Sequence, residues 1–509
     1  MRKRRQDPRR HGNHHYQALR PGRGPGFRSR GTPPGKHQRS NHGEQGLPWV
    51  ECRHGHHRRR WQRHRGPDPR VGRLGERDPG PDDHTRPVSL LRSFPGLVVR
   101  PDWADRVTTG PYDAYSADER IAIAEANPYS FLNVTRSQED IPSDQRDDVD
   151  WLISLCAKSM QRIYDVGAYA EFEEATLFLY RLETDSHVQT GVMGLVPVTE
   201  PDDRRILRHE AFRPGRAELL TRHLLEIGMS SSPISLTYRT DKGLEAALAA
   251  GCGGEPVLET DGDGIHQTVW AVVDEVAEAI VEALGDRPLY VTDGHHRLAA
   301  AVEARRRNPG IDRDHPLQWT QAVLFPDAEM QVLAAHRRVG DRHGRSTSEL
   351  TAALTEVVAL EQCNQIEAAR PSIPGTAGAY IGGHWFRFDL PKASGDRAVD
   401  LLDVSRLQDG VLEPVFGITD PANDPNIDYV PEPVGIEALV NRCDADGRIG
   451  FLVHATSVAE MMAVADEDDL MPPKSSYFEP KPRSGVFVRR LDREAQWAMG
   501  PNSGGTAGG

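Results

Sequence analysis

The stretch of residues 288–301 reads PLYVTDGHHRLAAA. Its apolar start predicts a short strand over residues 289–291, and the alanine-rich continuation predicts a helix over residues 298–307. A strand that ends in a glycine turn and opens a helix directs several backbone N–H groups at one spot. The positive end of the helix dipole lies behind that spot. The stretch therefore predicts an anion-binding unit in an α/β protein.

The polar residues of this turn are Asp293, Gly294, His295, His296 and Arg297. Histidine and arginine side chains donate hydrogen bonds that suit phosphate oxygens. The alternative is a turn whose polar residues merely cap the helix, and a lone Asp-Gly pair would favour it. Two histidines and an arginine directly after that pair favour anion binding instead.

Charge is distributed very unevenly along the 509 residues. Residues 1–90 hold 22 Lys and Arg against 8 Asp and Glu, whereas residues 91–509 hold 40 against 67, a balance of −27. A general nucleic-acid binder needs a basic footprint for the phosphate backbone, which the acidic part lacks. The length of the chain favours two structured domains.

Residues 1–89 are rich in Arg, His, Gly and Pro, with few aliphatic residues, which predicts a disordered basic extension. A nucleic-acid-binding tail, a targeting peptide and an inert or mis-assigned extension are the three alternatives, and we favour the last. The segment lacks the apolar core of a secretory signal, and its acidic residues and prolines suit a transit peptide poorly. The pairs His14-His15 and His56-His57 have no ordered scaffold that would hold a metal.

Cysteine usage and hydropathy predict a soluble cytoplasmic protein. No apolar run of about 18 residues occurs, so no membrane span is expected. The cysteines form no CxxC pair and are odd in number, which favours reduced thiols over a disulfide framework or a zinc site. They are Cys52, Cys156, Cys252, Cys363 and Cys443.

Strand and helix patterns alternate along the ordered part, which predicts a mixed α/β (α+β) fold. The expected domains are 90–330 and a smaller α/β unit over 331–495, followed by a flexible Gly/Ser-rich tail over 496–509. In the first domain we expect strands over 175–181, 190–197, 233–238, 265–273 and 320–325, and helices over 148–164, 217–227 and 275–284. In the second we expect helices over 348–360, 436–443 and 457–465, a hairpin over 379–389 and a strand over 449–454.

Three further stretches have compositions that packing does not readily explain. The first is TGPYD (109–113), followed by NPYSF (127–131), and the second is RHE (208–210), before a helix with Arg222 and His223. The third is MPPKSSYFEPKPRSG (471–485), which its prolines make a rigid loop. Loops often carry binding residues, and the two lysines and the arginine of this loop are candidates. A solvated basic loop without a binding role is an equally weighted alternative.

Together these stretches resemble the domain of unknown function 1015 family. The resemblance spans residues 91–490, and Gly110 stands where this family would read proline. In its DGHHR element the family is similar to the ParB/sulfiredoxin-like superfamily. Members of that group place nucleotide phosphates on the N-terminus of the helix after such a turn, which implies a ParB/sulfiredoxin-like nucleotide-binding unit here. The resemblance is carried by PYD (111–113), HE (209–210), TDGHHR (292–297), LLDVSRLQDGVLEPVFGI (401–418), IDYV (427–430) and MPPKSSYFEPKPRSGVFV (471–488).

The free-serine kinases of that superfamily are the nearest enzymatic relatives by resemblance. They imply a small-molecule kinase that phosphorylates free L-serine from ATP or ADP with Mg²⁺. The alternative is a nucleotide-binding regulatory protein of the ParB-like type without turnover. The acidic balance and the lack of a helix-turn-helix pattern disfavour a DNA-bound regulator. The expected partners are a nucleotide and a small hydroxy amino acid, with no membrane and no specific nucleic acid.

Phosphoryl transfer requires cationic donors, a metal and a base for the hydroxyl. Asp293 is expected to hold Mg²⁺ or to orient a histidine. Glu210 is the candidate general base, against the alternative of an ordinary surface glutamate. His296 joins these two as the third expected catalytic residue. The residues expected to bind the nucleotide are Gly294, His295, His296 and Arg297, with Lys474, Lys481 and Arg483 closing over the phosphates or the substrate carboxylate.

Other nucleotide and hydrolase sites are disfavoured by spacing. Adjacent histidines diverge and rarely share one ion, and no HExxH pair occurs, which disfavours a zinc hydrolase. The sequence contains no GxSxG elbow and no GxxxxGK[ST] loop, which excludes the common serine hydrolases and P-loop enzymes.

Overall fold

A computed structural model describes residues 89–200, 202–230 and 232–492. The expected basic extension up to residue 88, both histidine pairs, Cys52 and the expected C-terminal tail lie outside the described residues. All of the described residues belong to one compact unit, residues 81–509.

The largest sheet has eight strands in the order β5-β10-β7-β11-β4-β3-β9-β8. β10 is parallel to β5 and β11 is parallel to β7, while the other neighbours are antiparallel. The sheet is therefore mixed, as the expected α/β fold requires. Its strands are β3 (Leu177–Glu183), β4 (Val188–Pro197), β5 (Ile206–Leu207), β7 (Ile234–Tyr238), β8 (Leu258–Gly262), β9 (Ile265–Val272), β10 (Leu289–Asp293) and β11 (Trp319–Pro326).

Both faces of this sheet are buried, which explains why its central strands read as continuous apolar runs. Alternate residues of β3 belong to different cores: Leu177 and Leu179 lie in one, Phe178 and Tyr180 in the other. Because side chains alternate along a strand, the two cores lie on opposite faces of the sheet.

A six-stranded sheet has the order β14-β16-β15-β18-β13-β17, and all its neighbours are antiparallel. Its strands are β13 (Ala335–Val339), β14 (Glu361–Cys363), β15 (Thr376–Ile381), β16 (His384–Asp389), β17 (Ile427–Pro431) and β18 (Ile449–Val453). The remaining strands form two small sheets. The first has the order β2-β1-β20-β6, and its strands are β1 (Leu97–Val99), β2 (Tyr169–Glu171), β6 (Met229–Ser230) and β20 (Phe487–Arg490). The second is the pair β12 (Val332–Leu333) and β19 (Tyr477–Phe478).

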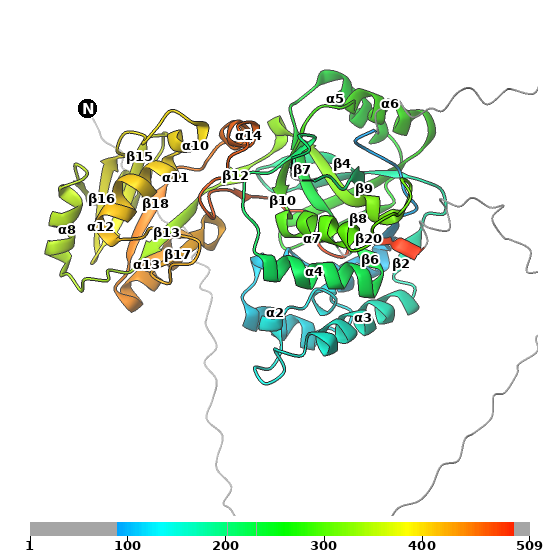
Figure 1. Cartoon of the computed structure of the whole chain (residues 1–509), viewed down its shortest axis with the longest axis horizontal. Helices are drawn as coiled ribbons and strands as arrows, with labels where there is room; N and C mark the ends of the chain where they lie inside the picture. Colours follow the sequence, from blue (N-terminus) through cyan, green and yellow to red (C-terminus); the bar gives the residue numbers. More distant parts are fainter. Residues whose placement is uncertain (1–88, 201, 231, 493–509) are drawn as a thin grey trace, which may run out of the picture. The chain divides into compact units, whose positions relative to one another are not determined.

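Helices α4 and α7 lie side by side (Figure 1), and the Thr221 hydroxyl of α4 donates to the Ala300 carbonyl of α7 at 3.4 Å. The buried alanines of α7 permit this close approach because they carry no bulk beyond Cβ. The helices are α1 (Pro101–Val107), α2 (Ala117–Ala126), α3 (Val149–Asp165), α4 (Pro214–Ile227), α5 (Lys242–Gly251), α6 (Asp274–Leu284), α7 (His295–Arg306), α8 (Thr347–Thr355), α9 (Ile366–Ala369), α10 (Ala398–Leu401), α11 (Asp403–Leu407), α12 (Glu413–Phe416), α13 (Ile436–Asp446) and α14 (Val458–Asp466).

The mixed α/β fold expected from the sequence is confirmed, and most expected elements end within three residues of the observed ones. The helix expected over residues 348–360 is the exception, because α8 ends at Thr355. The hydroxyls of Thr351 and Thr355 bond back to the carbonyls four residues earlier, and two β-branched residues, Val357 and Val358, follow. These features weaken the last turns of the expected helix.

The domain limits expected from the sequence remain a prediction. The C-terminal segment nevertheless pairs with early strands, since β20 lies between β1 and β6 in one sheet. The four described cysteines are all unpaired, as expected. None of the helices in the described part of the chain combines the length and hydropathy that a bilayer crossing needs.

Candidate functional site

The junction between β10 and α7 places the open end of a helix at the DGHHR turn. Gly294 adopts φ +95° and is the N-cap residue, so α7 begins at His295. The sequence prediction of a helix from Leu298 was wrong by three residues, because a single glycine in the left-handed region suffices for the turn. His295, His296 and Arg297 therefore occupy the first turn, and among the described residues no acceptor takes their backbone N–H groups.

Asp293, the last residue of β10, holds two cations beside this helix end. Its Oδ2 lies 2.5 Å from the Arg297 guanidinium, and its Oδ1 lies 3.4 Å from Lys481 Nζ. Burial by itself would raise the pKa of Asp293, but the charges of Lys481 and Arg297 outweigh it and hold the pKa well below its ordinary value. The ionised carboxylate thus positions both cations. The Nε of Arg297 is buried and has no hydrogen-bond partner in the described part of the chain, so this guanidinium keeps an unused donor.

Two buried histidines pack against each other below the turn. The rings of His209 and His295 form an edge-to-face pair with centroids 4.7 Å apart. Burial lowers the pKa of His209 to about 4, and burial together with the nearby His209 lowers that of His295 well below its ordinary value. Both are neutral at pH 7, and His295 Nε2 is buried without a partner.

His296 is neutral for a similar reason. Burial lowers its pKa to about 4, with further contributions from Arg216, Arg213, Lys474 and Arg297. Its Nε2 accepts a hydrogen bond from the backbone N–H of Arg213 at 3.0 Å. The ring proton is therefore assigned to Nδ1, which leaves His296 a donor to an anion rather than a free base.

Two arginines to which the sequence analysis gave no role, Arg208 of the RHE stretch and Arg213, belong to the same neighbourhood. Arg208 and Arg213 have no carboxylate within 4.0 Å among the described residues. Arg208 is half-buried with an unpartnered Nε, and burial lowers its pKa. A cation that is kept partly desolvated without an acidic partner carries an electrostatic cost that an anionic ligand would relieve. Both arginines lie in the segment between β5 and α4, and this shared position in the sequence could have indicated that they belong to one site.

The loop of residues 471–485 lies against this cluster. Met471 N–H donates to the His209 carbonyl at 2.8 Å, and the Ser476 hydroxyl lies 3.3 Å from His209 Nε2. Lys481 is buried, with its Nζ 4.8 Å from the centre of the Tyr477 ring. Lys474 is exposed on a turn with φ +55°. The structure therefore brings Lys481 to Asp293 and leaves Lys474 near His296.

Arg483 occupies a different place from the one expected. Its guanidinium is buried, pairs with Asp263 at 2.7 Å and donates to the Gly262 carbonyl at 2.9 Å. Asp263 also accepts a hydrogen bond from the Tyr115 hydroxyl at 2.9 Å. These contacts anchor the end of the loop to the β8–β9 hairpin, and none of them involves the β10–α7 junction.

The other stretches singled out in the sequence divide into two groups. Thr109 forms an antiparallel bridge with Ser484, and Phe131 packs on Gly485, so the TGPYD and NPYSF stretches flank the end of the 471–485 loop. Arg222, by contrast, pairs with Asp150 and Glu226 at an exposed surface. His223, the neighbour of Arg222 in the sequence, is buried within α4.

Glu210, the expected general base, follows the buried His209 and is half-buried. Its charge contributes to raising the pKa of Tyr429, after burial of that phenol and against the charge of Arg337. Glu210 is therefore next to the histidine pair and within electrostatic range of β17. Its expected role as a base remains a prediction.

The residues present do not fit a magnesium site. Both carboxylate oxygens of Asp293 already contact cations, and no histidine donates a hydrogen bond to this carboxylate among the described residues. No group of three or more His, Cys, Asp or Glu side chains that would hold a metal occurs there either. Magnesium prefers an octahedron of oxygen ligands, which two adjacent ammonium and guanidinium groups oppose.

Comparison with known proteins gives a family and a set of structural relatives. A sequence model of the family described as "Protein of unknown function (DUF1015)" matches residues 91–405, which confirms the resemblance drawn from the motifs. No curated protein matches the sequence. Among solved structures, the chain is similar to a free serine kinase in complex with AMP, with a TM-score of 0.31, 12% identity and coverage of 59% of this chain and 92% of that one. It is also similar to SbnI with C-terminal truncation from Staphylococcus aureus, with a TM-score of 0.32, 12% identity and coverage of 60% and 94%. A third similar structure is a conserved hypothetical protein from Pyrococcus furiosus, with a TM-score of 0.31, 11% identity and coverage of 59% and 96%.

Proposed function

Because the chain belongs to the DUF1015 family, whose description assigns no activity, we propose a function from the site itself. The β10–α7 junction binds the phosphates of a nucleotide, ATP or ADP. The bound nucleotide donates its terminal phosphoryl group to the hydroxyl of a small amino acid, for which free L-serine is the proposed acceptor.

One observation carries the proposal. The open N-terminal amides of α7 lie beside two buried side-chain nitrogens, His295 Nε2 and Arg297 Nε, that have no hydrogen-bond partner among the described residues. Buried polar groups are normally hydrogen-bonded, and leaving one unpaired costs roughly 1–3 kcal/mol. A phosphate would satisfy these donors together with the helix end, whose dipole attracts anions.

The proposed transfer conserves atoms and charge. The serine hydroxyl oxygen attacks the terminal phosphorus, a new O–P bond forms, and the bond to the bridging oxygen breaks to release ADP or AMP. The hydroxyl proton passes to Glu210. Arg297 and Lys481, both held by Asp293, stabilise the charge on the phosphoryl oxygens, and His296 donates from Nδ1.

Binding without turnover is a second candidate, and one observation favours it. Both carboxylate oxygens of Asp293 contact cations, so the described residues of the junction offer no free carboxylate for the metal ion that phosphoryl transfer normally uses. A regulatory protein of the ParB-like type needs the phosphate site and no base.

The two candidates are separated with the full chain. Isothermal titration with ADP and with ATP measures binding, and mass spectrometry detects phosphoserine after incubation with L-serine, nucleotide and Mg²⁺. Binding together with phosphoserine supports the kinase, and binding without a phosphorylated product from any hydroxy amino acid supports the regulator. No binding of either nucleotide contradicts both candidates.

A further inference from the structure

Tyr112, in the GPYD stretch, contacts two guanidinium groups with its ring. The Cζ of Arg120 lies 3.8 Å from the ring centre and that of Arg216 lies 4.4 Å from it. Both distances are within the range of a cation–π interaction. Tyr112 begins the single-turn helix η1 (Tyr112–Ala114), whereas Arg216 lies in the first turn of α4, so the ring joins two segments far apart in the sequence.

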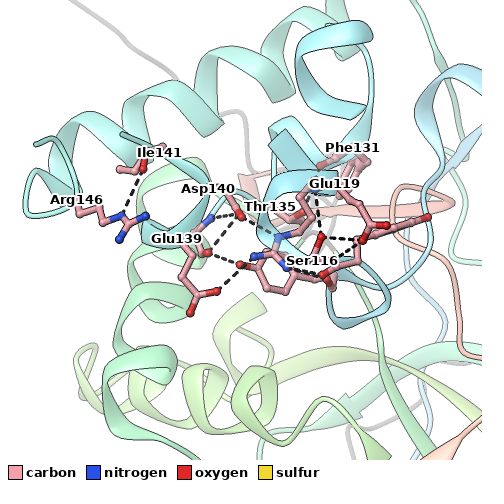
Figure 2. A network of polar contacts seen from close by, with 12 residues as sticks. Ser116, Glu119, Phe131, Thr135, Glu139, Asp140, Ile141 and Arg146 are labelled. Carbon is pink, nitrogen blue, oxygen red and sulfur yellow. Dashed lines mark hydrogen bonds and ion pairs between the residues drawn. The ribbon is translucent and has the colours of Figure 1, made fainter. Parts of the chain in front are cut away.

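The ring itself is held firmly. Arg120 is buried and pairs with buried Asp140 at 2.7 Å, and it also donates to the Tyr115 carbonyl at 2.7 Å. Figure 2 shows this polar network, in which Arg120 also pairs with Glu139 at 3.3 Å and Glu119 accepts a hydrogen bond from the hydroxyl of Ser116, the N-cap residue of α2. The Tyr112 hydroxyl hydrogen-bonds the Ser137 hydroxyl. Charge-assisted bonds of this kind fix both Arg120 and the ring that lies against it.

Arg216, in contrast, has no acidic partner. No carboxylate lies within 4.0 Å of it and no hydrogen bond is made by its guanidinium among the described residues, although the side chain is half-buried. Arg213 is the N-cap residue of α4, three positions before Arg216, and its backbone N–H donates to His296 Nε2. The start of α4 therefore lies beside the first turn of α7.

We propose that Arg216 is a phosphate contact of the β10–α7 site and that Tyr112 is the residue that positions it. This inference rests on the proposed nucleotide binding. The guanidinium carbon lies over the Tyr112 ring, and none of the guanidinium N–H groups donates to an acceptor among the described residues, so they remain available for the bidentate hydrogen bonds that suit phosphate. Tyr112 acts only through Arg216 and touches no ligand itself.

The charges that face His296 support the arrangement. They come from α4 and its preceding loop (Arg216 and Arg213), from the 471–485 loop (Lys474) and from α7 itself (Arg297). After burial, Arg216 is the largest of these contributions to the lowered pKa of His296. Removing Arg216, or releasing it from Tyr112, should therefore raise the pKa of His296 toward its ordinary value.

The test uses Arg216→Ala, Tyr112→Leu, Tyr112→Phe and the double variant of the first two, in the full chain. The control is Arg106→Ala, which removes an arginine that lies over two other rings, 4.4 Å from the centre of Trp103 and 4.7 Å from that of Tyr129. Loss of one charged hydrogen-bonding group weakens ADP binding by roughly tenfold to a hundredfold. We expect this loss for Arg216→Ala and Tyr112→Leu, wild-type affinity for Tyr112→Phe and the control, and no additional loss in the double variant.

Titration of His296 by NMR gives a second readout in those ligand-free variants whose spectra show the native fold, with Arg106→Ala measured alongside. A raised pKa in Arg216→Ala and in Tyr112→Leu supports the proposal, and an unchanged pKa in Arg216→Ala overturns it even where Tyr112→Leu does not fold. Unchanged ADP affinity of Arg216→Ala overturns the phosphate contact. Additive losses in the double variant overturn the positioning by Tyr112. A wild-type protein that binds no ADP removes the proposed function and the phosphate contact together, while the titration still decides whether Tyr112 holds Arg216 beside His296.

Discussion

Replacing Gly294 by alanine tests the junction most directly, because the cost divides into two parts of known origin. The first part is conformational: a residue with Cβ at φ +95° costs roughly 1–2 kcal/mol. The second is steric, since the new Cβ would lie 2.9 Å from Arg297 Nε and 3.0 Å from Ile234 Cγ2. Ile234 is buried in the central sheet, so the half-buried Arg297 side chain must move. Overpacking of this kind adds roughly 1–3 kcal/mol.

Gly228→Ala is the matched control for this prediction. Gly228 has φ +70°, and nothing lies within 4 Å of the position its Cβ would take, so this variant carries only the conformational cost. The entropic effect of alanine on the unfolded chain is common to both variants and cancels in their comparison. We expect Gly294→Ala to be less stable than Gly228→Ala by roughly 1–3 kcal/mol in chemical denaturation.

Binding of ADP, measured by titration calorimetry, should separate the two variants further. Displacement of Arg297 removes a phosphate donor, which corresponds to a loss of roughly tenfold or more in affinity. Gly228→Ala should bind like the wild-type protein. Equal stabilities and equal ADP affinities of the two variants would refute the reasoning, because the contact of Gly294 with Arg297 would then have no consequence.

Three other predictions follow from the site. Arg297→Ala should weaken ADP binding by roughly tenfold to a hundredfold in calorimetry. The control is Arg307→Ala, which changes an arginine at the far end of α7 that pairs with Glu218 and Glu303. Equal losses of affinity in both variants would exclude a specific role of Arg297 in binding. His209 has a folded-state pKa of about 4 against an ordinary 6.5, so its contribution to stability is complete above pH 6.5 and is lost as the pH falls toward 4. Between these pH values the wild-type protein should lose roughly 3 kcal/mol of unfolding free energy that the His209→Gln variant does not lose, as measured by urea denaturation. Identical pH profiles of the two proteins would show that His209 is not buried in its neutral form. Glu210→Gln should keep ADP affinity and slow phosphoserine formation by roughly 100-fold or more in a mass-spectrometric time course, whereas a wild-type rate would show that another group takes the proton.

The strands and helices with a clear periodicity of apolar residues could be predicted from the sequence. A strand whose buried side chains are charged could not. β13 contains His336, Arg337 and Arg338, all buried, and hydropathy gives no reason to expect a central strand there. Its Arg338 is neutralised by Asp428 at 3.2 Å and Asp446 at 2.5 Å, which come from β17 and α13. Such compensation depends on tertiary neighbours and leaves no local pattern.

The candidate site shows the same division. The DGHHR turn was predictable because its elements are consecutive, and the glycine, the helix end and the donors follow from local rules. The link from Asp293 to Lys481 spans the chain and rests on the course of the 471–485 loop. Arg483 shows that composition does not predict which partner a cation contacts. It lies two residues from Lys481 in the sequence, but it pairs with a different carboxylate, that of Asp263.

The acidic balance of the folded part and a site for anions are physically compatible. Residues 91–509 carry a net charge of −27, which by itself would repel a nucleotide. At an ionic strength of 0.1 M, however, exposed charges are screened beyond about 10 Å, so most of the acidic surface contributes little at the site. Partly buried cations are screened much less, and at the β10–α7 junction they outnumber the one carboxylate, Asp293, that contacts them. Since that carboxylate is engaged by Arg297 and Lys481, the field at the helix end is set by Arg208, the open amides and the unused donors of the cluster. Local geometry, rather than net charge, therefore sets the electrostatics of the proposed phosphate site.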